Sequence, residues 1–184
     1  MVLLAVLVAA CANAGGPVIS TGERYAQDAA LTDTYVLGAG DKVRLLVFNE
    51  QNLSGEFSVS SDGMLSLPLV GDVPAADRTT RAIADDVARM LADGYLQNPR
   101  VTMEVLTYRP FFILGEVTTP GQYPYAAGMT VLNAIATANG FTPRAKHGTV
   151  FIRRRGEKAE LEYALTPDLK VMPGDTIRLD ERYF

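Results

Sequence analysis

Gly-Asp-Lys-Val-Arg-Leu at residues 40–45 and Gly-Asp-Thr-Ile-Arg-Leu at residues 174–179 follow one pattern, Gly-Asp-x-(Val/Ile)-Arg-Leu, and decide the fold. In each copy glycine permits a positive φ, aspartate can close an Asx-type turn, and the β-branched residue points inward from the strand that follows. We therefore predict a turn leading into a strand at both places. The repetition favours two related β-rich units over one continuous sheet.

Outward from the first copy, alternating apolar residues predict strands at 43–48, 56–60 and 64–70. Asp62-Gly63 is typical of a type I′ hairpin turn between the last two strands. Pro68 indicates that the third strand lies at a sheet edge or ends there.

A helical pattern follows over residues 79–95, and Thr79 or Thr80 can cap its start. Alternation returns at residues 101–105, so the first unit is a strand, a hairpin, a helix and a strand. The apolar stripe of the helix consists of Ile83, Val87, Met90 and Leu91.

The second unit has the same mixed character. Its predicted helix covers residues 130–139, and Asn139-Gly140 is typical of a helix C-terminus. We expect an α+β fold of two small mixed modules, each with one main helix against a small sheet. The predicted strands of the second unit are 111–117, 149–154, 159–163 and 175–179, with a turn at Pro120-Gly121 after the first.

Composition limits the classes of function. The chain has 184 residues, a net charge of -4, one cysteine and one histidine. The net acidity argues against a nucleic-acid-binding surface. One cysteine excludes an intrachain disulfide, and one cysteine with one histidine argues against a His/Cys metal cage. The sequence lacks the nucleophile-elbow, phosphate-loop, dinucleotide and zinc-protease motifs, so we predict no enzymatic activity, no catalytic residue, no metal and no cofactor.

The N-terminus predicts export. Residues 1–10 form an uncharged apolar run with the length of a signal-peptide apolar region, too short to span a membrane. Residues 8–11, Val-Ala-Ala-Cys, are similar to a bacterial lipobox, which makes Cys11 the candidate lipidation site. Residues 11–33 then form the tether of a lipid-anchored protein. The alternative is a buried cysteine in a short N-terminal element.

A local excess of positive charge lies between Arg144 and Lys158. Guanidinium groups bind carboxylates in a bidentate manner, so these side chains are candidates for contact with an acidic polysaccharide or a neighbouring subunit. The alternative is a solvated hairpin end. The four candidates are Arg144, Lys146, Arg153 and Arg155.

Several motifs together resemble the outer-membrane polysaccharide export (OPX, Wza-type) family. Residues 35–45, 67–71 and 95–101 are similar to its polysaccharide-export domain. Residues 114–117, Pro120-Gly121 and residues 130–140 are similar to the soluble-ligand-binding β-grasp (SLBB) domain that follows. On this basis residues 34–108 are the export domain and residues 109–184 the SLBB domain.

The resemblance implies a periplasmic lipoprotein, anchored to the outer membrane, that forms a homo-oligomeric ring for capsular polysaccharide or exopolysaccharide. It also implies an inner-membrane polysaccharide co-polymerase, often a tyrosine autokinase, as partner. Large members carry a C-terminal membrane-crossing helix, whereas this sequence resembles the short members. Either the ring then docks against a separate outer-membrane pore, or the sequence is incomplete.

Two alternatives remain open from the sequence. The chain is then either a monomeric β-grasp periplasmic binding protein for a small ligand or glycan, or an accessory enzyme acting on the polysaccharide. The second needs a pair of carboxylates with the spacing of glycoside hydrolysis, which the sequence does not indicate.

Overall fold

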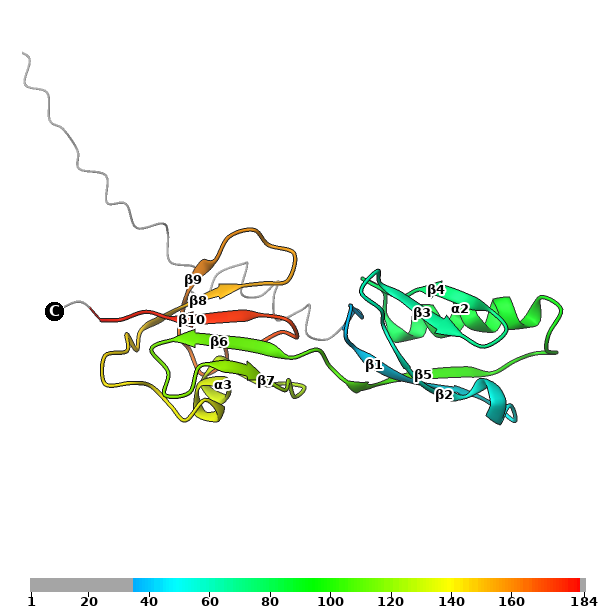
Figure 1. Cartoon of the computed structure of the whole chain (residues 1–184), viewed down its shortest axis with the longest axis horizontal. Coiled ribbons are helices and arrows are strands. Elements are labelled where there is room, and N and C mark those ends of the chain that lie inside the picture. The colour runs from blue at the N-terminus through cyan, green and yellow to red at the C-terminus, as the bar shows by residue number, and fades with distance from the viewer. Residues whose placement is uncertain (1–34, 183–184) are drawn as a thin grey trace, which may run out of the picture.

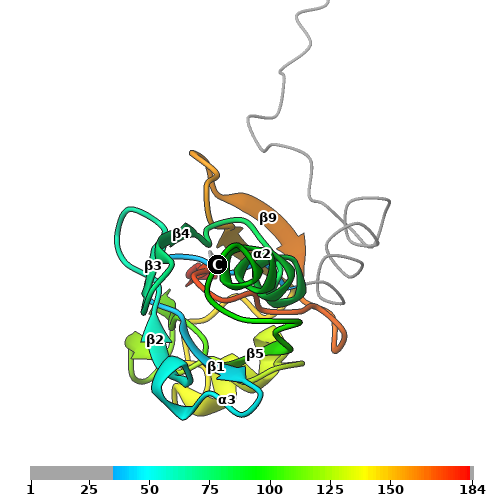
Figure 2. The ribbon, with the colours of Figure 1, turned by 90° about the vertical axis from the view of Figure 1, so that its right-hand side faces the viewer.

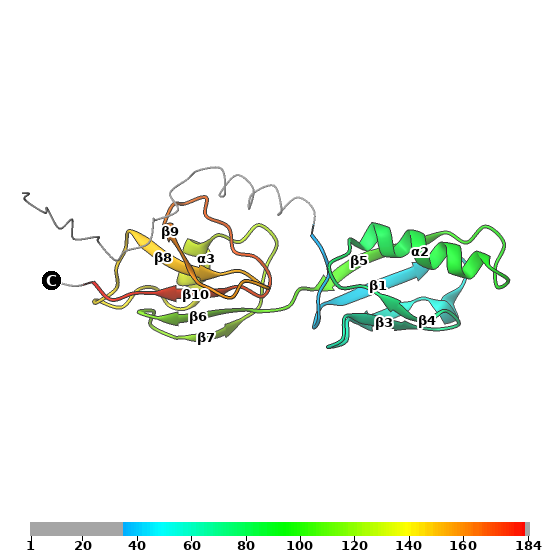
Figure 3. The same ribbon diagram turned by 90° about the horizontal axis from the view of Figure 1, so that it is seen from above.

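A computed structural model describes residues 35–182, which form two mixed units joined at residues 108–110 (Figure 1). Each unit has its own hydrophobic cluster and one α-helix packed on a sheet. The predicted α+β class is confirmed. The two units lie end to end along the long axis of the molecule, as Figures 1 and 3 show.

The first unit is built around β1 (Lys42–Val47), the central strand of an antiparallel sheet in the order β2-β1-β5. Its flanking strands are β2 (Gly55–Ser58) and β5 (Val101–Thr107), and the 3-10 helix η1 (Gln51–Leu53) connects β1 to β2. A separate two-stranded sheet pairs β3 (Met64–Leu67) with β4 (Gly71–Pro74).

Helix α2 (Thr80–Ala92) covers one face of the β2-β1-β5 sheet (Figure 2). The Thr79 hydroxyl caps it by accepting a hydrogen bond from the Ala82 N–H at 3.2 Å. Alternate residues of β1 are buried in the same cluster as one face of α2, which joins sheet and helix in one core. These residues are Val43, Leu45 and Val47 of β1 and Ile83, Val87 and Leu91 of α2.

Three predictions in the first unit need correction. Met90 is 38% exposed, and Ala84 is buried instead, because the buried face of α2 is centred between Val87 and Leu91 and Met90 falls at its edge. The turn at Asp62-Gly63 is not type I′, since of these two residues only Gly63 has a positive φ. This turn also joins strands of different sheets. The third correction concerns strand β4, which was not predicted. Strand β3 ends at Leu67, directly before Pro68, so the predicted range 64–70 was too long, and of the two interpretations of Pro68 the strand end is confirmed.

The second unit contains one mixed sheet in the order β7-β6-β10-β8-β9. The central strand β10 (Thr176–Leu179) runs parallel to β6 (Phe111–Gly115) and antiparallel to β8 (Thr149–Arg153). The two edges are β7 (Gly121–Tyr123), which was not predicted, and β9 (Leu161–Ala164).

Helix α3 (Val131–Thr137) packs against this sheet through Val131, Ala134 and Ile135. Thr130 and Asn133 form a capping box at its start. The predicted C-terminus is confirmed, because Asn139 and Gly140 both have positive φ, and the Gly140 N–H donates to the Ile135 carbonyl at 2.9 Å.

Candidate functional site

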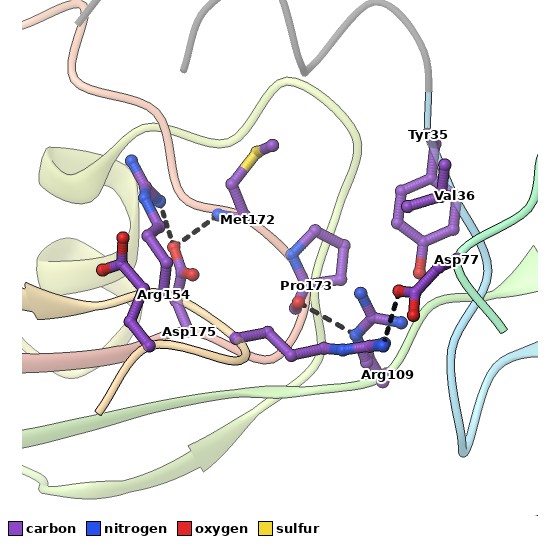
Figure 4. Close-up of a pocket in the computed structure, with 10 residues that line it drawn as sticks. Tyr35, Val36, Asp77, Arg109, Arg154, Met172, Pro173 and Asp175 are labelled. Carbon is purple, nitrogen blue, oxygen red and sulfur yellow. Dashed lines mark hydrogen bonds and ion pairs between the residues drawn. The ribbon is translucent and has the colours of Figure 1, made fainter. Parts of the chain in front are cut away.

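A cavity of about 320 Å³ lies where the two units meet (Figure 4). Both units and the segment between them supply its walls. The first unit contributes Tyr35, Val36 and Asp77, the connecting segment contributes Arg109, and the second unit contributes Arg154, Arg155, Glu157, Met172, Pro173 and Asp175.

The two Gly-Asp copies of the sequence form the same turn at this junction. In the first copy, the Asp41 N–H donates to the Gly38 carbonyl at 3.1 Å, and the Gly38 N–H donates to Asp41 Oδ2 at 2.8 Å. In the second copy, the same two bonds join Asp175 and Met172, at 3.1 and 2.7 Å. The glycine before each aspartate has a positive φ, 90° at residue 40 and 87° at residue 174. The repeated sequence therefore encodes a repeated turn.

Asp41 and Asp175 are also the two fully buried charged side chains within residues 35–182. A buried carboxylate is costly unless a cation and hydrogen-bond donors compensate for lost water. Asp41 receives the backbone N–H of Arg109 at 2.7 Å and its Nη1 at 3.2 Å. Asp175 pairs with Nη1 of Arg154, whose guanidinium also donates to the Lys170 carbonyl at 3.2 Å. The buried carboxylates of the two turns are therefore paired with two different arginines.

Arg109 contacts both turns. Its guanidinium pairs with Asp41 in the first unit. Its Nε donates to the Pro173 carbonyl of the second turn at 3.0 Å, as Figure 4 shows. The side chain is 12% exposed. One arginine in the connecting segment therefore joins the two repeated turns.

Tyrosines line the same junction. The Tyr35 hydroxyl donates to Asp41 Oδ2 at 2.5 Å, and the Arg109 guanidinium lies 5.6 Å from the centre of the Tyr35 ring. Tyr108 makes edge-to-face contacts with Tyr35 and Tyr125, with ring centres 4.8 and 5.3 Å apart. Burial, followed by the hydrogen bond to Asp41, raises the pKa of Tyr35 far above its ordinary value. Tyr35 therefore remains a neutral hydrogen-bond donor.

The four predicted contact residues are spread over the second unit. Arg144 pairs with Glu181, Lys146 with Glu162 at 3.0 Å, and Arg153 donates to the Thr176 hydroxyl at 3.2 Å. Arg155 reaches the first unit and pairs with Asp77 at 2.8 Å. The structure brings only this last residue of the four to the junction cavity. The predicted lipidation site, Cys11, lies outside the described residues.

The sequence did not indicate Arg109, Arg154 or Tyr35 as site residues. The repeated Gly-Asp pattern identified the turns, but the Arg109 and Asp41 partners lie 68 positions apart. In the structure each arginine lies just after a strand, β5 or β8, that pairs with the strand its Gly-Asp turn begins, and the sequence alone does not show this pairing.

Within residues 35–182, no group of three or more His, Cys, Asp or Glu side chains is arranged to hold a metal ion. His147 stacks on Phe141, with ring centres 4.4 Å apart. No helix in this range has the length and hydrophobicity needed to cross a membrane.

Both units match known protein families. Residues 29–106 match the family described as polysaccharide biosynthesis/export protein, and residues 110–161 match the SLBB domain. The chain is 36% identical over 162 residues to the exopolysaccharide production protein ExoF of Rhizobium meliloti (strain 1021). The match covers 77% of this chain and 38% of that relative, so the chain spans less than half of the relative's length.

Proposed function

We propose that this chain, which belongs to the polysaccharide biosynthesis/export family, is a periplasmic subunit of an exopolysaccharide export complex. The observation that carries the proposal is the order of the two matched domains, together with the similarity to a relative named for exopolysaccharide production. In this role the chain performs no covalent chemistry. It binds neighbouring subunits and lines a path for the polymer.

The proposed anchor is a lipid on Cys11, which would hold the protein at the periplasmic face of the outer membrane. The proposed assembly is a closed homo-oligomeric ring, in which each subunit uses two different faces. Both sheets supply apolar surface for such contacts, because Leu46 in β1 and Phe112 in β6 are 54% and 42% exposed. The proposed partners are an inner-membrane co-polymerase with tyrosine autokinase activity and a separate outer-membrane pore.

Deletion of the gene tests the export role directly. We expect exopolysaccharide to decrease in the medium and to accumulate in the periplasm, and the full chain supplied from a plasmid should restore secretion. A C11S variant that is made in normal amount should restore less, because it has no lipid anchor. Normal secretion by the deletion strain, in the absence of a second copy of the gene, would contradict the export role.

The four basic candidates, Arg144, Lys146, Arg153 and Arg155, are proposed contacts to polymer or neighbouring subunit. Arg153 is the best single test, since it is exposed and donates a hydrogen bond to the Thr176 hydroxyl rather than to a carboxylate. We expect R153E to reduce secretion while the protein level stays constant. The matched control is R81E, a charge reversal at an exposed position of α2. Equal secretion by both variants would remove Arg153 from the contact surface.

The junction cavity favours a second candidate function, a monomeric binding protein for a small ligand or glycan. Sedimentation of the lipid-free chain distinguishes the export subunit from the monomeric binding protein. A ring predicts a larger species that forms as concentration rises or when the co-polymerase is added. A chain that stays monomeric under both conditions would favour the binding protein.

A further inference from the structure

We propose that Arg109 and Arg155 form a latch that fixes the orientation of the two units. The latch consists of the Arg109 contacts with Asp41 and Pro173 and the Arg155 contact with Asp77. The hydrophobic clusters of the two units share no buried residue, so the angle at the junction depends on contacts made across it. These are the aromatic contacts of Tyr108 with Tyr35 and Tyr125 and the polar contacts of the latch.

The Arg109 part of the latch is the rigid one. Its partner Asp41 is fully buried and also receives the backbone N–H of Arg109, so the carboxylate cannot move without losing several bonds. A guanidinium is planar, and its donors point in fixed directions. When Nη1 points at Asp41 and Nε at the Pro173 carbonyl, the second turn is held at a set position relative to the first.

The Arg155 part adds a second point of attachment. Arg155 follows β8 in the second unit, and its Nη2 lies 2.8 Å from Oδ1 of Asp77 in the first unit. The backbone of Asp77 is held in place, because its N–H donates to the Leu37 carbonyl at 2.9 Å, while its side chain is 75% exposed. One point of contact permits rotation about that point, whereas a second point at a different place restricts it.

Because Gly38 has no side chain, it leaves room for the guanidinium groups of both Arg109 and Arg155. A Cβ atom at this position would overlap Nη1 of Arg109 and Nη1 of Arg155. Gly38 has no positive φ, so its backbone accepts alanine without strain. The variant G38A should therefore displace both guanidinium groups while every charged residue of the latch stays in the chain.

The consequence is a subunit that behaves as one rigid body. A ring of identical subunits closes only when each presents its two contact faces at one angle. The latch would supply that angle if the proposed ring forms, but the latch itself is measured on the isolated chain and does not depend on export.

The test measures the distance between the two units by pulsed electron resonance in the full-length chain. Spin labels are placed on C11S/D85C/D168C, since Asp85 and Asp168 are exposed and lie in different units. We expect a narrow distance distribution in this background. G38A and R155Q should each shift it or make it roughly twofold wider, as expected for a released hinge. R109Q should have the larger effect.

The matched control is R153Q, which changes an exposed arginine that contacts its own unit through Thr176. The distance distribution of R153Q should equal that of the spin-labelled C11S/D85C/D168C chain without a further substitution. Circular dichroism establishes that each variant is folded, and G38A and R155Q keep the test decisive if R109Q unfolds, because they leave Asp41 and Arg109 in place. Distributions of unchanged width and position in folded G38A and R155Q would overturn the latch.

Discussion

Asp175 is a buried carboxylate whose charge is balanced by Arg154, a side chain that is itself only 11% exposed. The variant D175N keeps the size and a hydrogen-bond acceptor but leaves the arginine without this counter-charge. We expect it to lower the free energy of unfolding by about 3 kcal/mol, measured by denaturant titration. D168N, at an exposed position, should change it by less than about 0.5 kcal/mol. Equal stabilities of the two variants would contradict this account of the turn.

Tyr35 makes stability depend on alkaline pH. Its pKa is raised in the folded chain by burial and by Asp41, whereas in the unfolded chain it titrates at its ordinary value of about 10. Its contribution is therefore complete below about pH 10 and decreases above it, since the unfolded state then loses a proton that the native state retains. At about pH 11 the loss is about 1.4 kcal/mol from this group.

The variant Y35F removes that dependence. Thermal unfolding followed between about pH 8 and pH 11 should show a smaller loss of stability for Y35F than for the unchanged chain. The control is Y95F, which alters a tyrosine that is 54% exposed. A pH profile of Y35F identical to that of Y95F would show that Tyr35 titrates normally.

At the residue scale the sequence predicted turns but not their partners. The Gly-Asp pattern is local, so the Asx-type geometry at Asp41 and Asp175 followed from neighbouring residues. Burial of both carboxylates depends on arginines 68 and 21 positions away, and such distances carry no periodic signal. Arg155 was predicted as a contact residue, but its contact with Asp77 in the other unit required the three-dimensional structure.

Among the elements, β6 and β10 are joined where β6 ends. Gly115 has a φ of 84°, and a Cβ atom there would overlap the carbonyl oxygen of Leu179, which is backbone and cannot move aside. We expect G115A to be strongly destabilising, by more than the roughly 1 kcal/mol that a positive φ alone costs a non-glycine residue. Thermal unfolding measures the difference.

The control for that substitution is G71A. Gly71 has a φ of 74°, so alanine experiences the same backbone strain, but nothing lies within 4 Å of the added atom. The stability difference between G115A and G71A therefore isolates the overlap at the strand pair. If G71A proves as unstable as G115A, the close approach of β6 and β10 contributes nothing.

Both helices and most strands were predicted, whereas β4 and β7 were not. Helix α2 was recognised from its stripe and its Thr79 cap, although Met90 lies at the edge of the buried face. Strand β4 has one buried residue, Val73, and β7 has none, so neither shows an alternating pattern. Their existence follows from pairing with β3 and β6, which the local sequence does not specify.

At the scale of the whole molecule, separate cores predict separate local stabilities. Ile83 and Ile177 are fully buried, each in a different cluster. We expect I83A to reduce amide hydrogen-exchange protection in α2, β1 and β5 more than in β6, β8 and β10, and I177A to do the reverse. An equal loss of protection in both units for either variant would show that the two cores unfold as a single cooperative body.

The central place of β10 sets an order for folding. β10 (Thr176–Leu179) is the last strand of the described chain, yet it lies between β6 and β8 and pairs with both. All strands of the first unit are available once residue 107 has emerged, whereas the sheet of the second unit lacks its middle until residue 179 arrives. The first unit can therefore fold while the second is still incomplete, when β6 and β8 each lack their β10 neighbour. During that interval the two open strand edges are exposed to non-native pairing.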